Sequence, residues 1–407
     1  MRFSTLTQRI AGEAAAAWDI HYQALEQRRQ GREVALLTMG DPDFDTPLPV
    51  VEAAVASLLR GDTHYSDVRG SLALREAIAE QRGLAPERVV VTAGAQCALY
   101  AVFQCLFQAG DEVIVAEPMY VTYHGVLGAC GAEAVQVSVR PEEDFRLDPG
   151  AVAAAITGRT RGLLLNSPHN PTGTCINQAD LERLAQLCRE HDLWLVCDEV
   201  YRGLQFEGEA PNPLALPGMA ERCVVIDSLS KSHAMSGWRV GWVIAPLALV
   251  THLGNLAMAM LFGLPEFVMQ AACVALSDAL PEVARMRDAY RQRRDRVCSA
   301  LQNCPGVQAR RPAGGMFVML DVRGTGLGAQ AFARRLLDEE GVALLPGDVF
   351  GPSAAGHVRL GLVLEAEVLE QLCRCIAACA ARVLAEQAGG DVDGEAKDRR
   401  VEDEAYQ

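Results

Sequence analysis

The spacing of hydrophobic positions predicts alternating strands and helices over most of the chain. Short apolar runs bounded by turn-forming residues are typical of buried strands, whereas apolar residues recurring three or four positions apart are typical of helices. By this criterion, strands are expected at 34–37, 89–92, 112–116, 134–139, 162–166, 193–197, 223–226 and 240–244. Helices are expected at 11–30, 49–60, 72–81, 95–107 and around Leu181, Leu184, Leu187 and Cys188.

This alternation predicts an α/β fold with a mostly parallel sheet covered by helices. Beyond it, helices are expected at 246–260, 267–279 and 281–302, followed by a second, smaller α/β region with strands at 316–320, 342–345 and 357–362 and helices at 329–340 and 365–387. A chain of 407 residues suits two domains. The predicted division is an N-terminal arm with part of the small domain (1–45), a large domain (46–289), the small domain (290–387) and a disordered acidic tail (388–407).

Composition and charge narrow the classes of function. The net charge of −15 argues against a nucleic-acid surface, since such surfaces are usually basic. The 13 cysteines are odd in number and lie mostly in apolar settings, without the paired spacing of a metal site, so a reducing compartment and no metal are expected. No signal peptide and no long apolar run is visible. We therefore expect a cytoplasmic protein without membrane partners.

Candidate chemistry centres on the stretch Ile226–Trp242, IDSLSKSHAMSGWRVGW. It places Lys231 between hydroxyl residues, with Arg239 eight positions later, on the connection between two expected strands. A lysine can form an imine with an aldehyde, and hydroxyls with an arginine suit a phosphate dianion. Pyridoxal phosphate carries both groups, so the stretch predicts a site for that cofactor.

Polar residues at other strand ends could complete such a site. Asp198 closes an apolar strand, where a weakly solvated carboxylate suits a cation such as a pyridinium nitrogen; the alternative is a helix cap or a loop salt bridge. Asn170 and Tyr201 could contact the ring oxygen of the cofactor, although Asn-Pro-Thr-Gly is also simple turn chemistry. Tyr120 could stack on a planar ring or belong to the core.

Two further features suit anionic groups. Gly94, Ala95 and Gln96 join an expected strand to an expected helix, where backbone N–H groups and the helix dipole favour an anion, although a tight turn needs the same residues. Arg359 lies in an otherwise apolar strand and requires a carboxylate, either of the protein or of a substrate.

Taken together, these motifs resemble the class I and II aminotransferases of the aspartate aminotransferase fold. The resemblance rests on Ser-Leu-Ser-Lys231, Asn170-Pro-Thr-Gly, Asp198-Glu-Val-Tyr201, Trp238-Arg239-Val-Gly and Val358-Arg359, in this order and spacing, and covers nearly the whole chain up to the tail. It implies the fold type I of the pyridoxal-phosphate-dependent transferases. It also implies ping-pong transamination, in which the cofactor carries the amino group from an amino acid to a 2-oxo acid.

The resemblance assigns roles to single positions. Lys231 matches the lysine that holds the cofactor and moves the proton, and Gly40, Asn170 and Arg359 match contacts to the substrate carboxylate. The cofactor contacts that it implies are Gly94, Ala95, Gln96, Tyr120, Asn170, Asp198, Tyr201, Ser228, Ser230, Lys231 and Arg239. Tyr65 matches a tyrosine that reaches the phosphate of the neighbouring subunit, which implies a homodimer with shared sites.

The chain departs from the dicarboxylate-specific enzymes in the segment Leu261–Glu266. In the dicarboxylate-specific enzymes, an arginine of the partner subunit holds the acidic side chain of the substrate. The segment that would supply this arginine here contains none and has Glu266 instead. A carboxylate suits a guanidinium, so Glu266, or failing it Asp19 or Asp67, is expected to select a cationic side chain. A surface glutamate without a role is the alternative.

Further segments, among them WDIHYQAL and GPSAAGHVRLGLVL, resemble transaminases of arginine and pyruvate. L-Arginine and pyruvate are therefore the expected substrates. The alternatives are another neutral or aromatic amino acid, a C–S β-lyase with the same cofactor contacts, and a ligand-sensing regulator. The segment before Gly40 is too short for the helix-turn-helix domain that such regulators usually carry.

Overall fold

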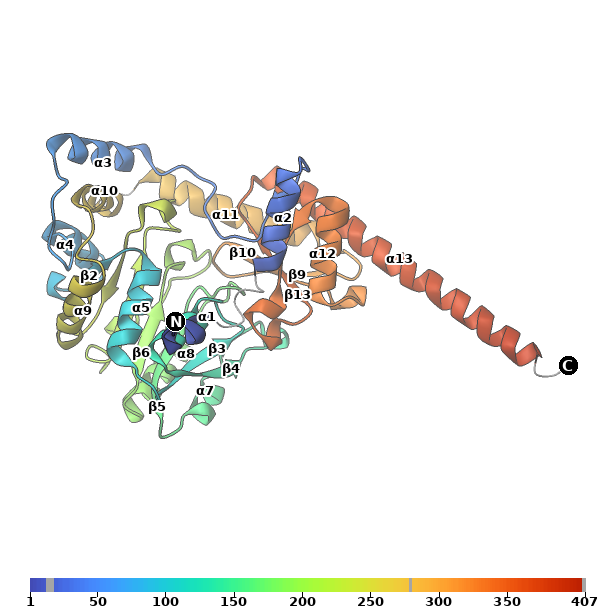
Figure 1. The fold of residues 1–407 in the computed structure, drawn as a ribbon, viewed down its shortest axis with the longest axis horizontal. Helices are drawn as coiled ribbons and strands as arrows, with labels where there is room; N and C mark the ends of the chain where they lie inside the picture. Colours follow the sequence, from blue (N-terminus) through green and yellow to red (C-terminus); the bar gives the residue numbers. More distant parts are fainter. Residues whose placement is uncertain (12–17, 278–279, 405–407) are drawn as a thin grey trace.

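The computed structural model describes residues 1–11, 18–277 and 280–404, with the side chains of 389–404 left out. Two bodies of secondary structure lie side by side, and the long helix α11 (Pro281–Ala300) runs between them (Figure 1). One body is built on a seven-stranded sheet and the other on a four-stranded sheet.

The larger sheet has the strand order β2-β8-β7-β6-β5-β3-β4. Strand β8 pairs antiparallel with both neighbours and the remaining pairs are parallel, so the sheet is mostly parallel, as predicted. Its strands are β2 (Val89–Thr92), β3 (Glu112–Glu117), β4 (Glu133–Ser138), β5 (Thr160–Asn166), β6 (Trp194–Asp198), β7 (Cys223–Ser228) and β8 (Gly241–Ile244).

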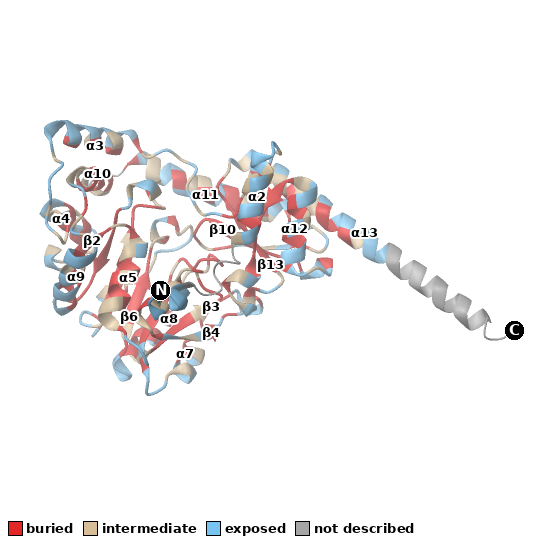
Figure 2. Ribbon diagram, in the orientation of Figure 1, coloured by how far each residue is buried: buried red, intermediate tan, exposed pale blue. Residues whose placement is uncertain are grey.

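Helices cover both faces of this sheet, which explains why its inner strands are largely apolar, whereas the edge strand β4 is mostly exposed or half-buried. Alternate residues of one strand join different cores: Leu163 and Leu165 of β5 face one side and Leu164 the other. On the first face lie α3 (Leu48–Arg60), α4 (Leu72–Glu80), α7 (Pro149–Ala155), α8 (Gln178–Glu190) and α10 (Glu266–Ser277). On the second lie α5 (Ala95–Leu106), α6 (Tyr123–Cys130) and α9 (Leu247–Met260). Figure 2 shows the strands buried between these layers.

The smaller body holds an antiparallel sheet of order β12-β13-β10-β9 and a short parallel pair, β1 with β11. These strands are β1 (Ala35–Leu36), β9 (Gln308–Arg310), β10 (Phe317–Asp321), β11 (Val342–Ala343), β12 (Leu345–Pro346) and β13 (His357–Gly361). Their core is shared with α11 and with α2 (Asp19–Arg29), α12 (Ala329–Glu340) and α13 (Ala366–Glu404). Helix α2 and strand β1 thus pack with the C-terminal part of the chain.

Most predicted elements are present, with three informative differences. Within the helix expected at 11–30, the structure shows the end of α1 (Thr5–Ala11) and the whole of α2; residues 12–17 lie outside the described part. The single strand expected at 342–345 is two strands, β11 and β12, in different sheets. Helices α6 and α7 and strand β9 were not predicted, because they are short and carry weak periodicity.

Other predictions meet the structure only in part. Helix α13 continues through most of the segment for which the composition predicts disorder, but the side chains from 389 on lie outside the described part, and that prediction remains open. All 13 cysteines are free thiols. Among the described residues, no single helix could cross a membrane, and only the bent pair 266–276 and 281–300 reaches the required length and apolarity when taken together.

Candidate active site

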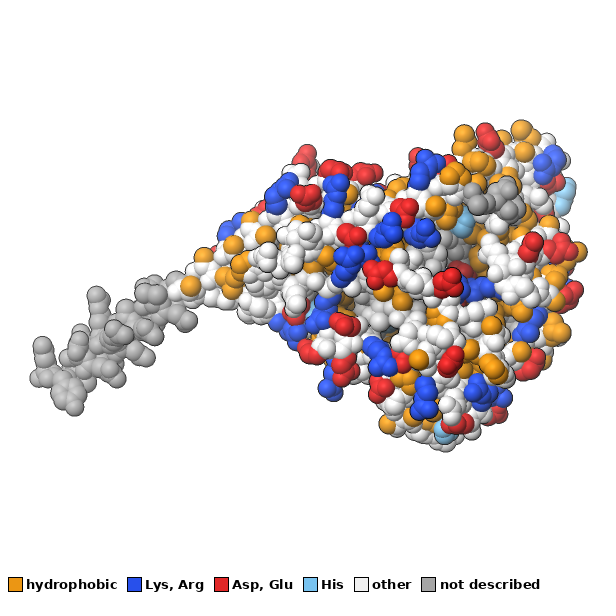
Figure 3. Space-filling model, turned by 180° about the vertical axis from the view of Figure 1, so that it is seen from behind, with side chains coloured by type: hydrophobic (Ala, Val, Ile, Leu, Met, Phe, Trp, Pro, Cys, Tyr) orange, Lys and Arg blue, Asp and Glu red, His pale blue; other side chains and the backbone are white. Residues whose placement is uncertain are grey.

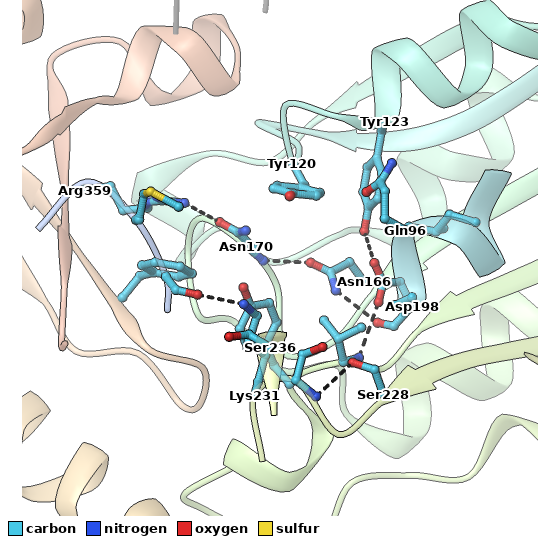
Figure 4. A pocket seen from close by; sticks show the side chains of 18 of the residues that line it. Gln96, Tyr120, Tyr123, Asn166, Asn170, Asp198, Ser228, Lys231, Ser236 and Arg359 are labelled. Atoms are coloured by element: carbon cyan, nitrogen blue, oxygen red, sulfur yellow. Dashed lines mark hydrogen bonds between the residues drawn. The ribbon is translucent and has the colours of Figure 1, made fainter. Parts of the chain in front are cut away.

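A cavity of about 280 Å³ opens at the carboxyl ends of the central parallel strands, on the side that faces the smaller sheet. Figure 4 shows the side chains that converge there. The predicted site residues that line it are Gly40, Ala95, Gln96, Tyr120, Asn170, Asp198, Tyr201, Ser228, Ser230, Lys231, Arg239 and Arg359. These residues come from several elements that are far apart in the sequence, so the fold alone brings them together.

Lys231 lies on the turn that follows β7, and its side chain points into the cavity (Figure 4). The Nζ atom donates a hydrogen bond of 2.7 Å to the carbonyl oxygen of Gly40. Burial lowers the pKa of Lys231, and Arg239 and Arg359 lower it further, against the opposing effect of Asp41. A lysine in this setting gives up its proton more readily than one in water, as a nucleophile or base requires.

Asp198 ends β6 at the floor of the cavity and is 3% exposed. Its carboxylate accepts hydrogen bonds from the Tyr123 hydroxyl (2.6 Å) and from the backbone N–H of Val200 (3.3 Å). Among the described residues no cationic side chain lies within 4.0 Å of it, and burial raises its pKa to about 6. A buried carboxylate with neutral partners only is poised to pair with a cation that enters the cavity.

A hydrogen-bonded chain joins the floor of the cavity to its opposite wall. Asn166, the last residue of β5, donates from its amide to the backbone oxygen of Asp198 (3.0 Å) and accepts from the N–H of Asn170 (2.8 Å). The side-chain oxygen of Asn170 in turn accepts from Nη1 of Arg359 at 2.8 Å. Tyr201 lies nearby, and burial raises the pKa of its phenol, so it remains a neutral hydroxyl.

Arg359 lies in β13, with its guanidinium between two rings. Its Cζ atom is 3.9 Å from the centroid of Phe317 and 4.7 Å from that of Phe350. Nη2 donates to the backbone oxygen of Thr38 (2.6 Å), whereas Nε has no partner. No carboxylate among the described residues lies within 4.0 Å, and burial lowers its pKa to about 10. Such an unpaired, 4% exposed cation calls for an anionic ligand.

The other end of the cavity combines a helix start with Arg239, a second cation that has no ion-pair partner in the part of the chain that the structure describes. Helix α5 begins at Ala95, so its first N–H groups lack partners within the helix. The Arg239 guanidinium donates to the carbonyl oxygens of Ser236 (2.6 Å) and Ala93 (3.3 Å). Gly94 has φ +80°, and a Cβ there would lie 2.4 Å from Nη2 of Arg239, so only glycine leaves room for the guanidinium. Ser228 and Ser230 add hydroxyls, and together these groups can bind a phosphate.

Tyr65 and Glu266 are not part of this cavity. Tyr65 lines a separate surface hollow formed by residues 63–66, 261–265 and 267, where its ring, 87% exposed, meets Phe262 edge to face at 4.9 Å. Glu266 is a sequence neighbour of these residues but does not line the hollow. Glu266 begins α10 and accepts a hydrogen bond from Gln270. Asp19 and Asp67 do not line the cavity either.

Several lining residues were missed by the sequence reasoning: Trp18, Met39, Leu99, Tyr123, Asn166, Val200, Ser236 and Phe317. Asn166 ends a parallel strand, so its position at the carboxyl end was a usable signal. Tyr123 begins the unpredicted helix α6, and nothing in the sequence indicated that it contacts Asp198.

The chain is similar to known proteins over most of its length. The family described as aminotransferase class I and II matches residues 32–376. The arginine–pyruvate transaminase AruH of Pseudomonas aeruginosa is 61% identical over 390 residues, which cover 94% of this chain and 99% of that protein. The aspartate/prephenate aminotransferase of Thermus thermophilus is 38% identical, with 90% and 96% covered.

Solved structures show the same fold. The aspartate aminotransferase of Thermus thermophilus with maleate superposes with a TM-score of 0.88 at 37% identity, over 93% of this chain and all of that one. The fold, the family match and the nearly full-length relatives agree, so the chain belongs to the class I and II aminotransferases.

Proposed function

We propose that this aminotransferase uses pyridoxal 5′-phosphate to move the α-amino group of L-arginine to pyruvate. The identity of 61% over nearly the whole of both chains to a protein named for that reaction carries the choice of substrates. The class I and II aminotransferases typically use this cofactor.

Three groups of residues in and beside the cavity support this choice of cofactor. Asp198 is a buried carboxylate without a cationic partner among the described residues, which suits a protonated pyridine nitrogen. The start of α5, with Arg239 and the space left by Gly94, suits the phosphate. Tyr120, whose pKa burial raises, offers an uncharged aromatic face, and Asn170 with Tyr201 offers donors for the ring oxygen.

The bound cofactor would supply an electron sink for the carbanion left when an amino acid loses its α-proton. The chain's own residues then have defined tasks. Lys231 is the covalent anchor and, once displaced by the substrate, the base that moves the proton. Arg359, with Asn170 and the Gly40 backbone, holds the α-carboxylate and so orients the bond to be broken. A ping-pong sequence follows, because donor and acceptor use the same carboxylate site in turn.

A screen of amino donors tests the proposed substrates. The protein loaded with cofactor is mixed with pyruvate and each amino acid, and alanine formation is measured. Arginine should give the highest kcat/KM. No alanine from arginine, with turnover of another donor, would overturn the substrate choice and leave the family intact. Pyruvate and ammonia from cystathionine without any acceptor would instead support the β-lyase.

We also propose a homodimer with shared sites, in the cytoplasm. Exposed apolar side chains gather on α3 and around the hollow that carries Tyr65: Leu48, Val55, Leu58, Leu59, Tyr65 and Phe262. Figure 3 shows hydrophobic side chains at the end of the molecule that holds α3. A patch of this kind marks an interface. It would bring Tyr65 to the phosphate of the neighbouring subunit and Glu266 to the substrate side chain.

The role proposed for Glu266 predicts a specific change in substrate preference. Glu266→Gln should raise the KM for arginine roughly tenfold and leave the KM for citrulline, its neutral isostere, within about twofold. The physical reason is that only the guanidinium loses a charge partner. Glu80→Gln, on an exposed carboxylate of α4 away from the hollow, is the matched control. An unchanged KM for arginine would contradict the assignment.

A further inference from the structure

Glu117, a buried carboxylate outside the cavity, joins the two sheets. It is the last residue of β3, is 2% exposed and lies opposite Ser138, the last residue of β4. Its carboxylate accepts hydrogen bonds from the hydroxyl of Ser138 (3.2 Å), the hydroxyl of Ser353 (2.5 Å) and the backbone N–H of Ser353 (2.8 Å). Ser138 belongs to the same sheet as Glu117, whereas Ser353 belongs to the connection between β12 and β13.

The connection to which Glu117 is hydrogen-bonded also carries Phe350, whose ring lies against Arg359. Phe350, three residues before Ser353, is 3% exposed and places its ring 4.7 Å from Cζ of Arg359. A second link crosses at the same place, because the N–H of Met119 donates to the backbone oxygen of Phe350 at 2.8 Å. Glu117 and Met119, at and just after the end of β3, therefore hold both ends of the 350–353 turn.

Gly351 shows how closely the turn sits on the carboxylate. Its φ is +141°, a conformation that residues with a side chain rarely adopt. A Cβ at this position would lie 2.1 Å from Oε1 of Glu117. The turn therefore packs directly against the Glu117 carboxylate, and any side chain at position 351 would push the turn away from it.

We propose that Glu117 is a positioning residue for substrate binding. Its hydrogen bonds to Ser353 fix the turn that carries Phe350. The Phe350 ring in turn orients the Arg359 guanidinium toward the substrate carboxylate. A cation held against an aromatic face is directed by that face, so a mobile Phe350 leaves Arg359 less ordered before the substrate arrives. The inference rests on the proposed role of Arg359.

Two serine variants separate this role from a merely structural one. Ser353→Ala removes a hydrogen bond to Glu117 that crosses between the sheets, while Ser138→Ala removes one to the same carboxylate within one sheet. Steady-state kcat and KM for arginine and pyruvate, and thermal unfolding, are measured for both loaded enzymes. Ser353→Ala should raise both KM values roughly fivefold with kcat within about twofold, as the loss of one charge-assisted hydrogen bond allows.

Ser138→Ala should leave both KM values unchanged, and Ser353→Thr, which keeps the hydroxyl, should restore them. Equal effects of the two alanine variants, or a loss confined to kcat, would overturn the proposal. Arg359→Lys is measured in parallel. If it leaves the KM values unchanged, the proposed role of Arg359 fails; if it raises them and Ser353→Ala does not, only the positioning role of Glu117 fails.

Discussion

Replacing Lys231 by alanine should abolish transamination, lowering kcat/KM at least about 10⁴-fold, because one side chain is proposed as both covalent anchor and base. The structure leaves no substitute: among the described residues that line the cavity, no other lysine and no histidine is present. The hydrogen bond from Nζ to the Gly40 oxygen holds the amine on the side of the cavity that faces the smaller body. Alanine formation from arginine and pyruvate measures the loss.

Two controls make this result specific. Lys231→Arg keeps a positive charge but presents a group that does not act as a base near neutral pH, so it should be nearly as inactive as the alanine variant. Small primary amines added to Lys231→Ala should restore part of the rate, since they can occupy the space of the side chain. Activity above about 1% of the wild type in the arginine variant would show that Lys231 is not the base.

The sequence was informative about the site wherever a polar residue ended an apolar strand. Asp198 interrupts an apolar run, and Lys231 follows one, and parallel strands bring such ends to one edge. Arg359 stood out for a similar reason, as a charge inside an apolar strand. In each case the charged group is conspicuous because the apolar residues around it imply a core, where a charge needs a partner.

Other parts of the site depend on tertiary packing that no local pattern encodes. Tyr123 contacts Asp198 from 75 positions away, through a helix too short to be predicted. No sequence motif singled out Phe317 or Phe350, and only the structure shows that their rings lie against Arg359. The same holds for the split of residues 342–345 between two sheets, since a strand's partner is chosen by the whole fold.

Asp198→Asn should have opposite effects on stability and on activity. Burial raises the pKa of Asp198 to about 6 from the ordinary 3.8, so the folded chain without cofactor binds this proton more tightly than the unfolded chain. The ionisation of Asp198 therefore lowers the free energy of unfolding. This loss is absent below pH 4, grows from pH 4 to 6 and is complete above pH 6. The loss caused by ionisation amounts to about 3 kcal/mol, and Asp198→Asn removes it. Asparagine has one oxygen fewer, so the variant loses about 1 kcal/mol of hydrogen bonding. A net gain of about 2 kcal/mol is expected at pH 8.

Activity should fall about 10³-fold in the same variant, because a neutral amide cannot pair with a protonated pyridine nitrogen. Denaturant unfolding of the cofactor-free proteins at pH 8 and pH 4.5 measures the first effect, which should shrink at the lower pH. Added cofactor should then stabilise the wild type more than Asp198→Asn, reversing their order. If the variant is less stable than the wild type at pH 8 without cofactor, Asp198 is already paired in the folded chain. The cavity would then contain no unpaired carboxylate that could bind a cation.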